Sequence, residues 1–440
     1  MHSSSRQDRP VPSVGTGQPL FAALRAPREL VFGAGQRAAL RWLAPRLGSR
    51  AFVCVDPFFA EDPEFTALLD LLDGAGVRCT VFAGVVPELP VAAVMTAVAA
   101  ARAAECDLFI AVGGGSCIDL AKVAACLCAH GGEPADYYGE FRVPGPILPL
   151  IAVPTTAGTG SEVTPVAVLT DSARTTKVGI SSPHLIPVAA ICDPELTLSC
   201  PPGVTASAGA DALSHCIEAY TSVRREPVPE LAGERVFVGR SEMTDAFCLA
   251  GISALVAGLP RAHSAPDDLA ARALVMYGSL MGGLAFGTAG TAAAHALQYP
   301  IGADTHTPHG IGVGLLLPYV MQFNQSARQP EFAEIARRFG AEGDDEGALA
   351  ARAPGLVQDF LAGVGIPTAL GEIGFDPDRL GWALEQGRAA VRLSENNPRA
   401  MDDDALAILR GAESGVLAGT GAAATATTAT TATTGKDASA

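Results

Sequence analysis

Short apolar runs alternate with amphipathic stretches over the first half of the chain. Continuous apolar runs, typical of strands buried on both faces, lie at Glu29–Phe32, Ala51–Val55, Arg78–Phe82, Leu108–Val112, Leu150–Val153, Val166–Thr170 and Ala189–Cys192. Segments with helical periodicity separate them, at Gln36–Leu47, Glu64–Ala75, Val91–Glu105 and Ile118–Cys128. Buried strands joined by helices are typical of a parallel, doubly wound sheet. We therefore expect an α/β nucleotide-binding domain over residues 21–200.

The pattern changes near Pro201, where the strand-like runs end. Long helical patterns follow at Ser207–Thr221, Thr244–Gly258, Asp267–Ala285, Thr291–Gly302, His309–Asn324, Gln329–Phe339 and around Val357–Phe360. They predict an all-α helical domain over residues 201–418. The polar segment Val223–Met243 interrupts it and has the proline and charge content of a long surface loop. Residues 1–20 are expected to form a flexible arm, and the Ala/Thr-rich residues 419–440 a disordered tail.

Composition narrows the classes of partner. Of 440 residues, 49% are hydrophobic, and the formal charge is −16. That is enough apolar material for a large core, and the acidic balance disfavours nucleic acid and anionic membranes as partners. The apolar stretches near Leu108–Val112 and Val313–Leu317 are shorter than the ~18 residues of a membrane span. Ten cysteines without a CxxC motif, and no apolar leader at the N-terminus, predict reduced thiols in a cytoplasmic protein.

Three consecutive glycines stand between a predicted strand and a helix. Gly113, Gly114 and Gly115 precede Ser116, and glycines at such a point let backbone N–H groups approach a diphosphate at the helix N-terminus. The spacing differs from GxGxxG, and a tight strand–helix turn is the alternative interpretation. Asp56 ends an earlier strand, where a carboxylate can accept the ribose 2′-hydroxyl of NAD and repel the phosphate of NADP. A helix cap explains Asp56 equally well.

Four residues of the second half have the composition of a divalent metal site. Asp211 and His215 are four residues apart and share one helix face, His295 opens an apolar helix, and His309 precedes another. One carboxylate and three imidazoles suit Fe²⁺ or Zn²⁺. The D-x₃-H spacing alone is common by chance, and His306 competes with His309 as a ligand. Glu218, seven residues after Asp211, is either a hydrogen-bond partner of a ligand or a solvated charge.

Together these motifs resemble the iron-dependent (group III) alcohol dehydrogenases, over residues 29 to 410. The run from Gly113 to Lys122 is similar to the family's GGGSxxDxxK pyrophosphate loop. Pro154 to Thr164 is similar to its PTTAGTGSEVT segment, and Gly209 to Tyr220 resembles the helix that carries its first two metal ligands.

The resemblance implies a dehydroquinate-synthase-like architecture, with the active site in a cleft between the two domains. It also implies an NAD-dependent alcohol dehydrogenase or aldehyde reductase that binds Fe²⁺ or Zn²⁺. Hydride transfer would involve a small alcohol or aldehyde whose oxygen the metal holds. The cofactor residues it implies, beyond Asp56 and the glycine loop, are Asp119, Thr155, Thr156, Ser161 and Lys177, and the metal ligands are Asp211, His215, His295 and His309. Members of the family are homodimers or larger homo-oligomers.

The chain departs from the family pattern in three places. Tyr299 stands where the family commonly has a histidine, so its hydroxyl is a candidate proton relay with a less convenient pKa near ~10. Val313 replaces an asparagine, and Val223–Met243 is longer than in short members; these positions are candidates for substrate selection.

Three alternatives remain open at this stage. One is a hydroxyacid–oxoacid transhydrogenase, and another is an enzyme of the same fold that acts on a phosphorylated substrate. The latter needs a basic pocket, and no compact arginine cluster stands near the ligands in sequence. The third is a non-catalytic protein that binds metal or nucleotide.

Overall fold

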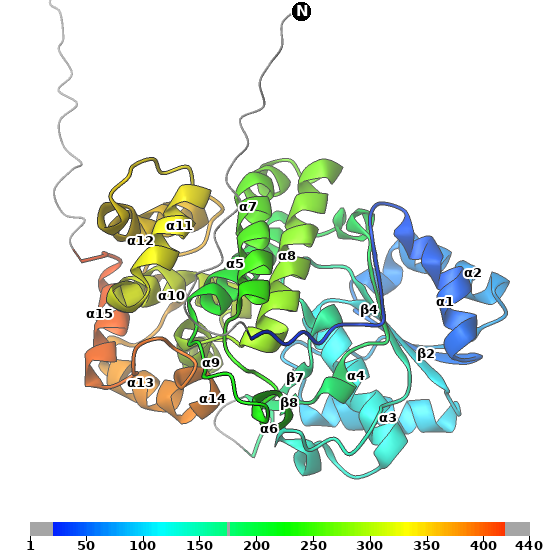
Figure 1. Ribbon diagram of the computed structural model, residues 1–440. Coiled ribbons are helices and arrows are strands. Elements are labelled where there is room, and N and C mark those ends of the chain that lie inside the picture. Colours follow the sequence, from blue (N-terminus) through cyan, green and yellow to red (C-terminus); the bar gives the residue numbers. More distant parts are fainter. Residues whose placement is uncertain (1–20, 174–176, 419–440) are drawn as a thin grey trace, which may run out of the picture.

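The computed structural model describes residues 21–173 and 177–418, which form an α/β part beside a helical part (Figure 1). The predicted arm (1–20) and tail (419–440) lie outside the described residues. A six-stranded sheet has the order β1-β9-β6-β4-β2-β3. Its strands, all paired in parallel, are β1 (Glu29–Phe32), β2 (Arg50–Val55), β3 (Arg78–Phe82), β4 (Leu108–Gly113), β6 (Leu150–Pro154) and β9 (Ala189–Cys192).

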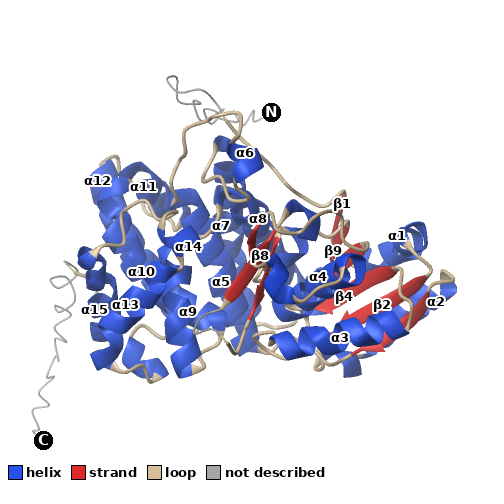
Figure 2. Cartoon of the chain, turned by 90° about the horizontal axis from the view of Figure 1, so that it is seen from below, coloured by secondary structure: helices blue, strands red, loops and turns tan. Residues whose placement is uncertain are grey.

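Helices cover both faces of this sheet, which explains why its central strands are apolar throughout. The helices are α1 (Leu40–Leu47), α2 (Pro63–Gly74), α3 (Val91–Ala103) and α4 (Gly115–His130). Alternate residues of a strand point to opposite faces. In β2, Phe52 and Cys54 join a core with α3 and α4, whereas Val53 and Val55 join a core with α1 and α2. The predicted parallel sheet is therefore confirmed, and Figure 2 shows it as one body of strands beside the helical part.

One predicted strand belongs to a different sheet. The run predicted at Val166–Thr170 forms β7 (Val166–Leu169), which pairs antiparallel with β8 (Val178–Ser181) in a three-stranded sheet completed by β5 (Gly139–Glu140). The reason is that β7 is buried on one face only, unlike the central strands of the large sheet. Side chains of α4 also bind its backbone: Lys122 Nζ donates to Val166 O at 2.8 Å, and Val168 N donates to Asp119 at 2.9 Å.

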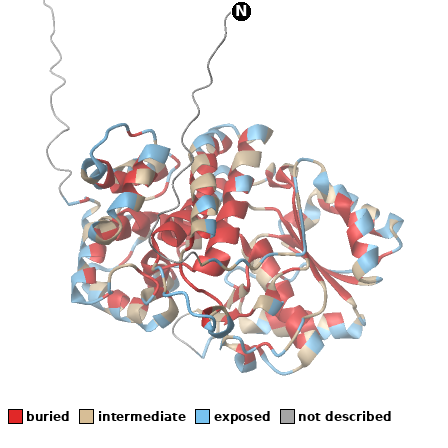
Figure 3. Ribbon diagram, in the orientation of Figure 1, coloured by how far each residue is buried: buried red, intermediate tan, exposed pale blue. Residues whose placement is uncertain are grey.

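The chain after Pro201 is helical, as expected. Its helices are α5 (Pro202–Thr221), α6 (Leu231–Glu234), α7 (Glu242–Ser264), α8 (Leu269–Ala289), α9 (Ala293–Thr305), α10 (His309–Asn324), α11 (Gln329–Arg338), α12 (Glu346–Ala362), α13 (Leu380–Ala389), α14 (Val391–Ser394) and α15 (Leu406–Ser414). Helix α5 lies at the centre and is buried from Gly209 to Thr221 (Figure 3). It packs against α7, α8 and α10.

Two of these helices correct the sequence-based view of membrane propensity. By length and composition, α7 and α8 could each cross a membrane. The apolar runs in the sequence did not reveal them, because their apolar residues are spread among Ala, Gly and Ser rather than gathered in one run. In the structure they pack on each other and on α5, and 72% of the apolar window of α8 is buried. Core helices of soluble proteins have the same composition, so the two helices are weak evidence for a membrane span.

The segment Val223–Met243 is not simply the surface loop that its composition predicts. It contains α6, and its residues Val236, Phe237 and Val238 are buried. Val238 N donates to Thr288 O at 2.8 Å, and the backbones of Arg224 and Gly239 pair in an isolated antiparallel β-bridge. The hydrophobic triplet was visible in the sequence, but the charges around it dominate the average polarity.

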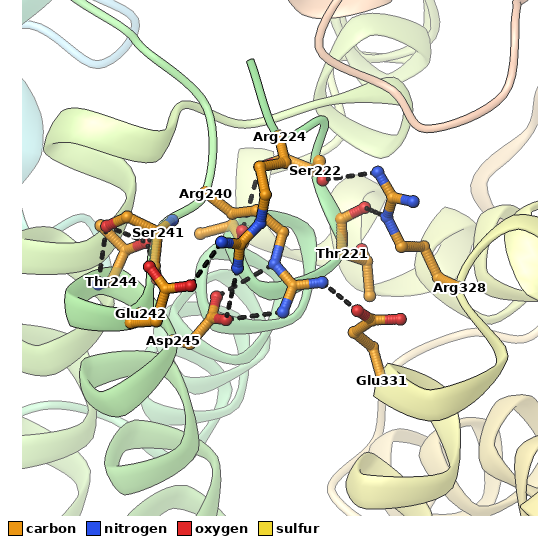
Figure 4. A network of polar contacts seen from close by, with 11 residues as sticks. Thr221, Ser222, Arg224, Arg240, Ser241, Glu242, Thr244, Asp245, Arg328 and Glu331 are labelled. Atoms are coloured by element: carbon orange, nitrogen blue, oxygen red, sulfur yellow. Dashed lines mark hydrogen bonds and ion pairs between the residues drawn. The ribbon is translucent and has the colours of Figure 1, made fainter. Parts of the chain in front are cut away.

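Arg240 fixes the end of this segment against the helices (Figure 4). Its guanidinium binds Asp245 of α7 at 2.6 and 3.1 Å and also pairs with Glu331 of α11. Arg328, directly before α11, donates to the carbonyls of Thr221 and Ser222, both at 3.1 Å, at the end of α5. The pairing of these charges compensates for the burial of this polar segment.

Glycine at position 310 permits the close approach of α10 to α5. A Cβ at Gly310 would lie 2.0 Å from the carbonyl oxygen of Ser207. Because that atom belongs to helix backbone, it cannot move without shifting α5 itself. The contact brings the first turn of α10, which carries His309, onto the helix that carries Asp211.

We expect Gly310→Ala to lower the free energy of unfolding by about 2 kcal/mol or more, since the added methyl group overpacks a backbone contact. Gly355→Ala in α12 is the matched control: its Cβ would meet nothing within 4 Å. Alanine there should stabilise the protein by about 0.5 kcal/mol through helix propensity. Urea unfolding followed by circular dichroism measures both, and equal effects of the two substitutions would contradict the role given to Gly310.

Candidate functional site

A cleft between the α/β part and the helical part brings the predicted motifs together. Gly115 and Ser116 of the glycine loop form one wall, and Asp211, His295 and His309 form the other. The cavity measures about 180 Å³. The cleft therefore joins the predicted nucleotide loop to the predicted metal ligands.

Asp211 is the centre of the ligand cluster. Its Oδ1 lies 3.8 Å from Nε2 of His215, 3.7 Å from Nε2 of His295 and 3.6 Å from Nε2 of His309. The rings of His215 and His295 stack at a centroid distance of 4.8 Å, and Phe286 stacks on the other face of His215 at 4.1 Å. The three histidines, from α5, α9 and α10, thus face one carboxylate oxygen. The ligand atoms of Asp211, His295 and His309 all lie within 4.8 Å of one another, whereas His215 is not part of that mutually close group.

Each imidazole is oriented through its other ring nitrogen. Nδ1 of His215 contacts Gly158 O at 3.3 Å, and Nδ1 of His295 contacts Glu218 Oε2 at 2.5 Å. Nδ1 of His309 contacts Gln298 Oε1 at 2.6 Å. An acceptor at Nδ1 places the proton there and leaves the lone pair on Nε2, which is the arrangement of a metal-ligating histidine.

Burial and the neighbouring charges shift the pKa values of the cluster in different directions. Burial raises the pKa of Asp211, but the neighbouring histidines outweigh it and hold the pKa well below its usual range. Burial lowers the pKa of His215 to about 4 and that of His309 to about 3, against the opposing field of Asp211. Burial also disfavours charge on His295, yet Glu218 and Asp211 raise its pKa to about 9.

The unsatisfied atoms of the cluster test whether a metal fits. Asp211 Oδ1 and His295 Nε2 are both buried and have no hydrogen-bond partner. Two such atoms side by side are costly unless something binds both. Asp211, His295 and His309 each offer a ligand atom, and these atoms lie within 4.8 Å of one another. A carboxylate with imidazole nitrogens suits Fe²⁺ or Zn²⁺, so the residues fit the expected ion.

Two alternatives left open by the sequence are resolved by this geometry. His306 is exposed at the end of α9, so His309 is the residue that faces Asp211. Glu218 is 2% exposed, and besides His295 it accepts from Ala292 N at 3.0 Å and Ala294 N at 2.6 Å. It is a buried partner of His295 and the N-terminal anchor of α9.

The glycine loop is shaped by its protein neighbours. A Cβ at Gly115 would lie 2.6 Å from Thr159, one at Gly114 would lie 3.1 Å from Thr156, and one at Gly113 2.7 Å from Cys117. A tight turn therefore requires these glycines whatever binds there. Gly115 and Ser116 nevertheless line the cleft at the start of α4, so the N–H groups of this helix face it.

Asp56 lies where both interpretations of it predicted. It follows β2, next to β4 in the sheet, and its Cβ approaches the glycine loop at Gly113. Its Oδ1 accepts from Phe58 N at 3.0 Å, so it caps the following turn.

Asp119 and Ser161 belong to a buried hydrogen-bond network. Ser161 Oγ donates to Asp119 at 2.5 Å and contacts Lys122 Nζ at 2.9 Å. Lys122, fully buried, also donates to the carbonyl oxygens of Thr164 and Val166 at 2.9 and 2.8 Å. Desolvation lowers the pKa of Lys122 to about 8. Asp119 and Ser161 line the cleft, but the interactions they make tie α4 to β7.

The two predicted threonines lie against the glycine loop rather than in the cleft. Thr155 N donates to Gly113 O at 3.2 Å, and Thr155 and Thr156 support the glycine loop without lining the cleft. Thr159, which the sequence analysis did not select, lines it instead. The motif was visible, but the direction of each side chain in an irregular loop was not.

Lys177 and Tyr299 both face the cleft, as expected for site residues. Lys177 pairs with Glu88 Oε1 at 3.3 Å. The Tyr299 ring lies 6.1 Å from that of His309. Burial raises the pKa of Tyr299, which Arg392 partly offsets. Val313, in contrast, is fully buried in the helical core and is not among the residues that line the cleft.

Sequence reasoning missed Phe237 and Arg392, which also line the cleft. Phe237 stands in the segment interpreted as a surface loop, and Arg392 stands on α14, about 80 residues beyond the last ligand. No local motif marks either residue, because their neighbours in the cleft are distant in sequence.

Comparison with known proteins agrees with this geometry. The family model described as "Iron-containing alcohol dehydrogenase" matches residues 27–194, and "Fe-containing alcohol dehydrogenase family, C-terminal" matches residues 205–412. The chain is 36% identical over 389 residues to long-chain-alcohol dehydrogenase 1 of Geobacillus thermodenitrificans, covering 86% of this chain and 94% of the relative. It is 31% identical over 369 residues to the NAD-dependent methanol dehydrogenase of Bacillus methanolicus, covering 82% and 93%.

Among solved structures, 1,3-propanediol oxidoreductase superposes with a TM-score of 0.82 at 30% identity, covering 89% of this chain and 99% of that one. The two family models together span the α/β part and the helical part, and therefore both walls of the cleft. The chain belongs to the iron-containing alcohol dehydrogenase family.

Proposed function

We propose that this chain is an NAD-linked alcohol dehydrogenase whose cleft interconverts a small alcohol and its aldehyde, with Asp211, His215, His295 and His309 as metal ligands. The observation that carries the proposal is the pair of buried, unpartnered atoms on Asp211 and His295. They face the same cleft as the N-terminus of α4. A cation site and an anion-binding helix end in one cleft suit a metal and a dinucleotide.

The bound groups would supply the reactive chemistry. Asp211, His215, His295 and His309 would hold a divalent ion that would supply Lewis-acid chemistry at an alcohol or carbonyl oxygen, and NAD(H) bound in the cleft would supply hydride chemistry. The chain's own residues provide position and environment. Glu218, Gln298 and the carbonyl of Gly158 keep the three imidazoles oriented, while Phe286 covers the His215 ring and excludes water from that side.

The cofactor-binding roles are part of the same proposal. Gly113, Gly114, Gly115 and Ser116 would receive the pyrophosphate through backbone N–H groups, with Thr155 and Thr156 holding the loop from behind. Asp119 and Ser161 would border the nicotinamide side, and Lys177 the adjoining ribose. Asp56, at the carboxyl end of β2, favours NAD over NADP because a carboxylate repels a 2′-phosphate.

Tyr299 is the candidate for moving a proton between substrate oxygen and solvent. The support is its position in the cleft beside His309. Its raised pKa keeps the phenol protonated at neutral pH, so it would act by donating a hydrogen bond to the substrate oxygen rather than as a base.

We also propose that the chain divides into the domains 21–200 and 201–418 and works in the cytoplasm as a homodimer or larger assembly. All ten cysteines are unpaired, which suits a reducing compartment. Strand β1 is an edge of the large sheet and carries the exposed side chains of Leu30 and Phe32. Phe32 contacts Tyr277, which is also exposed. An exposed apolar sheet edge is a template for pairing with a second copy.

The activity test is anaerobic oxidation of NADH with short aldehydes, using protein loaded separately with Fe²⁺ or Zn²⁺. We expect turnover that needs metal and prefers NADH to NADPH. Asp211→Ala and His295→Ala should each reduce it by about 10³-fold or more, because several kcal/mol of charge stabilisation is lost.

His184→Ala, an exposed histidine of the α/β part, is the matched control and should keep full activity. Protein that binds both NADH and metal yet reduces no aldehyde or ketone would refute the proposed activity.

Glu218→Gln should weaken metal binding about 10- to 100-fold, the usual effect of losing a hydrogen-bond partner of a ligand. The amide has one acceptor oxygen where the carboxylate has two, and its NH₂ group would meet an N–H donor at the start of α9 or on His295. A chelator-dye competition with Zn²⁺ measures the affinity, and circular dichroism checks the fold. Glu234→Gln, at an exposed glutamate of α6, serves as the control. Unchanged affinity in Glu218→Gln would restrict Glu218 to anchoring α9.

Phe32→Glu should convert the assembly to monomer, because it places a charge on the edge strand that a second copy would pair with. Size-exclusion chromatography with light scattering gives the mass of both proteins. A wild-type protein that elutes with the mass of one chain would refute the proposed assembly, and an assembly that survives the substitution would place its interface elsewhere.

A further inference from the structure

Arg392 is the one cationic side chain lining the cleft, among the described residues, for which the structure gives no acidic partner. Its guanidinium stacks over Phe237, with Cζ 4.3 Å from the ring centroid. The described residues provide no ion pair and no hydrogen bond to it. Lys177, the other cation of the cleft wall, is neutralised by Glu88 at 3.3 Å.

The acidic groups nearest Arg392 are already engaged. Glu140 accepts from Val236 N at 2.6 Å. Glu218 uses both oxygens on Ala292 N, Ala294 N and His295. Each influences Arg392 through space, but neither binds it. An arginine in this position retains its donors for a group that is not part of the described chain.

The surroundings of Arg392 orient those donors. Two cavities meet at this residue: the cleft, and a neighbouring cavity walled by Glu140 and Ser181 of the small sheet. Tyr299, Lys177 and Arg392 line both. Phe237 covers one face of the guanidinium. Its backbone is held on both sides, because Val236 N donates to Glu140 at 2.6 Å and Val238 N donates to Thr288 O at 2.8 Å. With one face covered by the ring, the guanidinium directs its N–H groups outward in its own plane, where they match two oxygens of a carboxylate or sulfonate.

We infer that Arg392 binds an anionic group of the substrate, so that the preferred substrate is a short aldehyde or alcohol carrying a carboxylate or sulfonate away from the reacting carbon. This rests on the proposed function, because the other end of the substrate must reach the metal ligands. The position fits that requirement, since Arg392 lines the same cleft as His309, and Tyr299, whose ring lies 6.1 Å from that of His309, lines both cavities together with Arg392. Arg392 is thus assigned a role in substrate specificity, whereas the hydride transfer takes place at the part of the cleft that carries the metal ligands.

The experiment compares matched pairs of aldehydes in the metal-loaded enzyme: glyoxylate with acetaldehyde, and succinic semialdehyde with butanal. For at least one pair we expect kcat/KM to favour the anionic member by about 10-fold or more. Arg392→Met should lower kcat/KM for that anionic aldehyde about 10- to 100-fold, mostly through KM, and should change the neutral aldehyde less than about 3-fold.

Arg399→Met is the matched control, since Arg399 also stacks on a phenylalanine, 3.9 Å from the Phe323 centroid, but lines neither cavity. It should leave the preference intact. Arg392→Lys, which keeps the charge and loses the planar fork, should give an intermediate KM and covers the case in which the methionine variant folds poorly.

A second measurement does not depend on turnover. Calorimetric titration of the Zn²⁺-loaded protein with ethanesulfonate in the presence of NADH should show binding that Arg392→Met weakens at least about 10-fold. Equal losses for charged and neutral aldehydes, an increase in the KM for NADH alone, or unchanged ethanesulfonate binding would each overturn the inference while leaving the dehydrogenase intact. If no aldehyde of either kind is reduced, the proposed function fails, and the titration alone then decides whether Arg392 binds anions.

Discussion

The burial of the Asp211 carboxylate is the constraint on which the cleft depends. A buried charge is costly unless basic groups and hydrogen bonds compensate for it. Here three imidazoles from α5, α9 and α10 surround one carboxylate oxygen at 3.6 to 3.8 Å. Each imidazole in turn needs an acceptor, and those acceptors come from a loop of the α/β part, from α5 and from α9. One charge therefore dictates how three helices and a loop are placed.

Small residues make this convergence sterically feasible. Gly310 lets the start of α10 reach α5, and Gly283 of α8 packs against Gly160, where a Cβ on Gly283 would lie 2.9 Å from the Gly160 Cα. The second contact joins the helical part to the loop that carries Gly158 and Ser161. Because backbone touches backbone at both points, the two walls of the cleft are set by rigid elements rather than by flexible side chains.

Much of the fold was predictable, since central strands covered on both faces leave continuous apolar runs and buried helices leave long apolar periodicities. The run at Val166–Thr170 looked like the others, but its partners, Lys122 and Asp119, act through hydrogen bonds to backbone that no hydrophobic pattern records. Val223–Met243 was misjudged for a similar reason. Its charges are paired with Asp245 and Glu331, so average polarity overstated its exposure.

The ligand residues could be proposed from sequence because chemistry limits which side chains hold a metal, and motif context chose among eight histidines. The choice of His309 rather than His306 as the ligand required the structure, because only the structure shows which of these two residues, three positions apart, points inward. The role of Glu218 also required the structure, because from sequence a glutamate on a helix face could equally well be exposed to solvent. Arg392 had no signal in the sequence, since its significance lies in the lack of an acidic partner among the described residues.

Net charge proved a poor guide to the cleft. A formal charge of −16 describes the surface, whose fields are screened over about 8 Å at physiological ionic strength. Inside the cleft the balance depends on a few groups and on whether each is already paired. In the cleft wall Lys177 pairs with Glu88, whereas Arg392 has no acidic partner among the described residues. Lys122, which does not line the cleft, binds serine and backbone oxygens. An acidic protein can therefore present a local site for an anion, because specificity follows the unpaired charge rather than the sum.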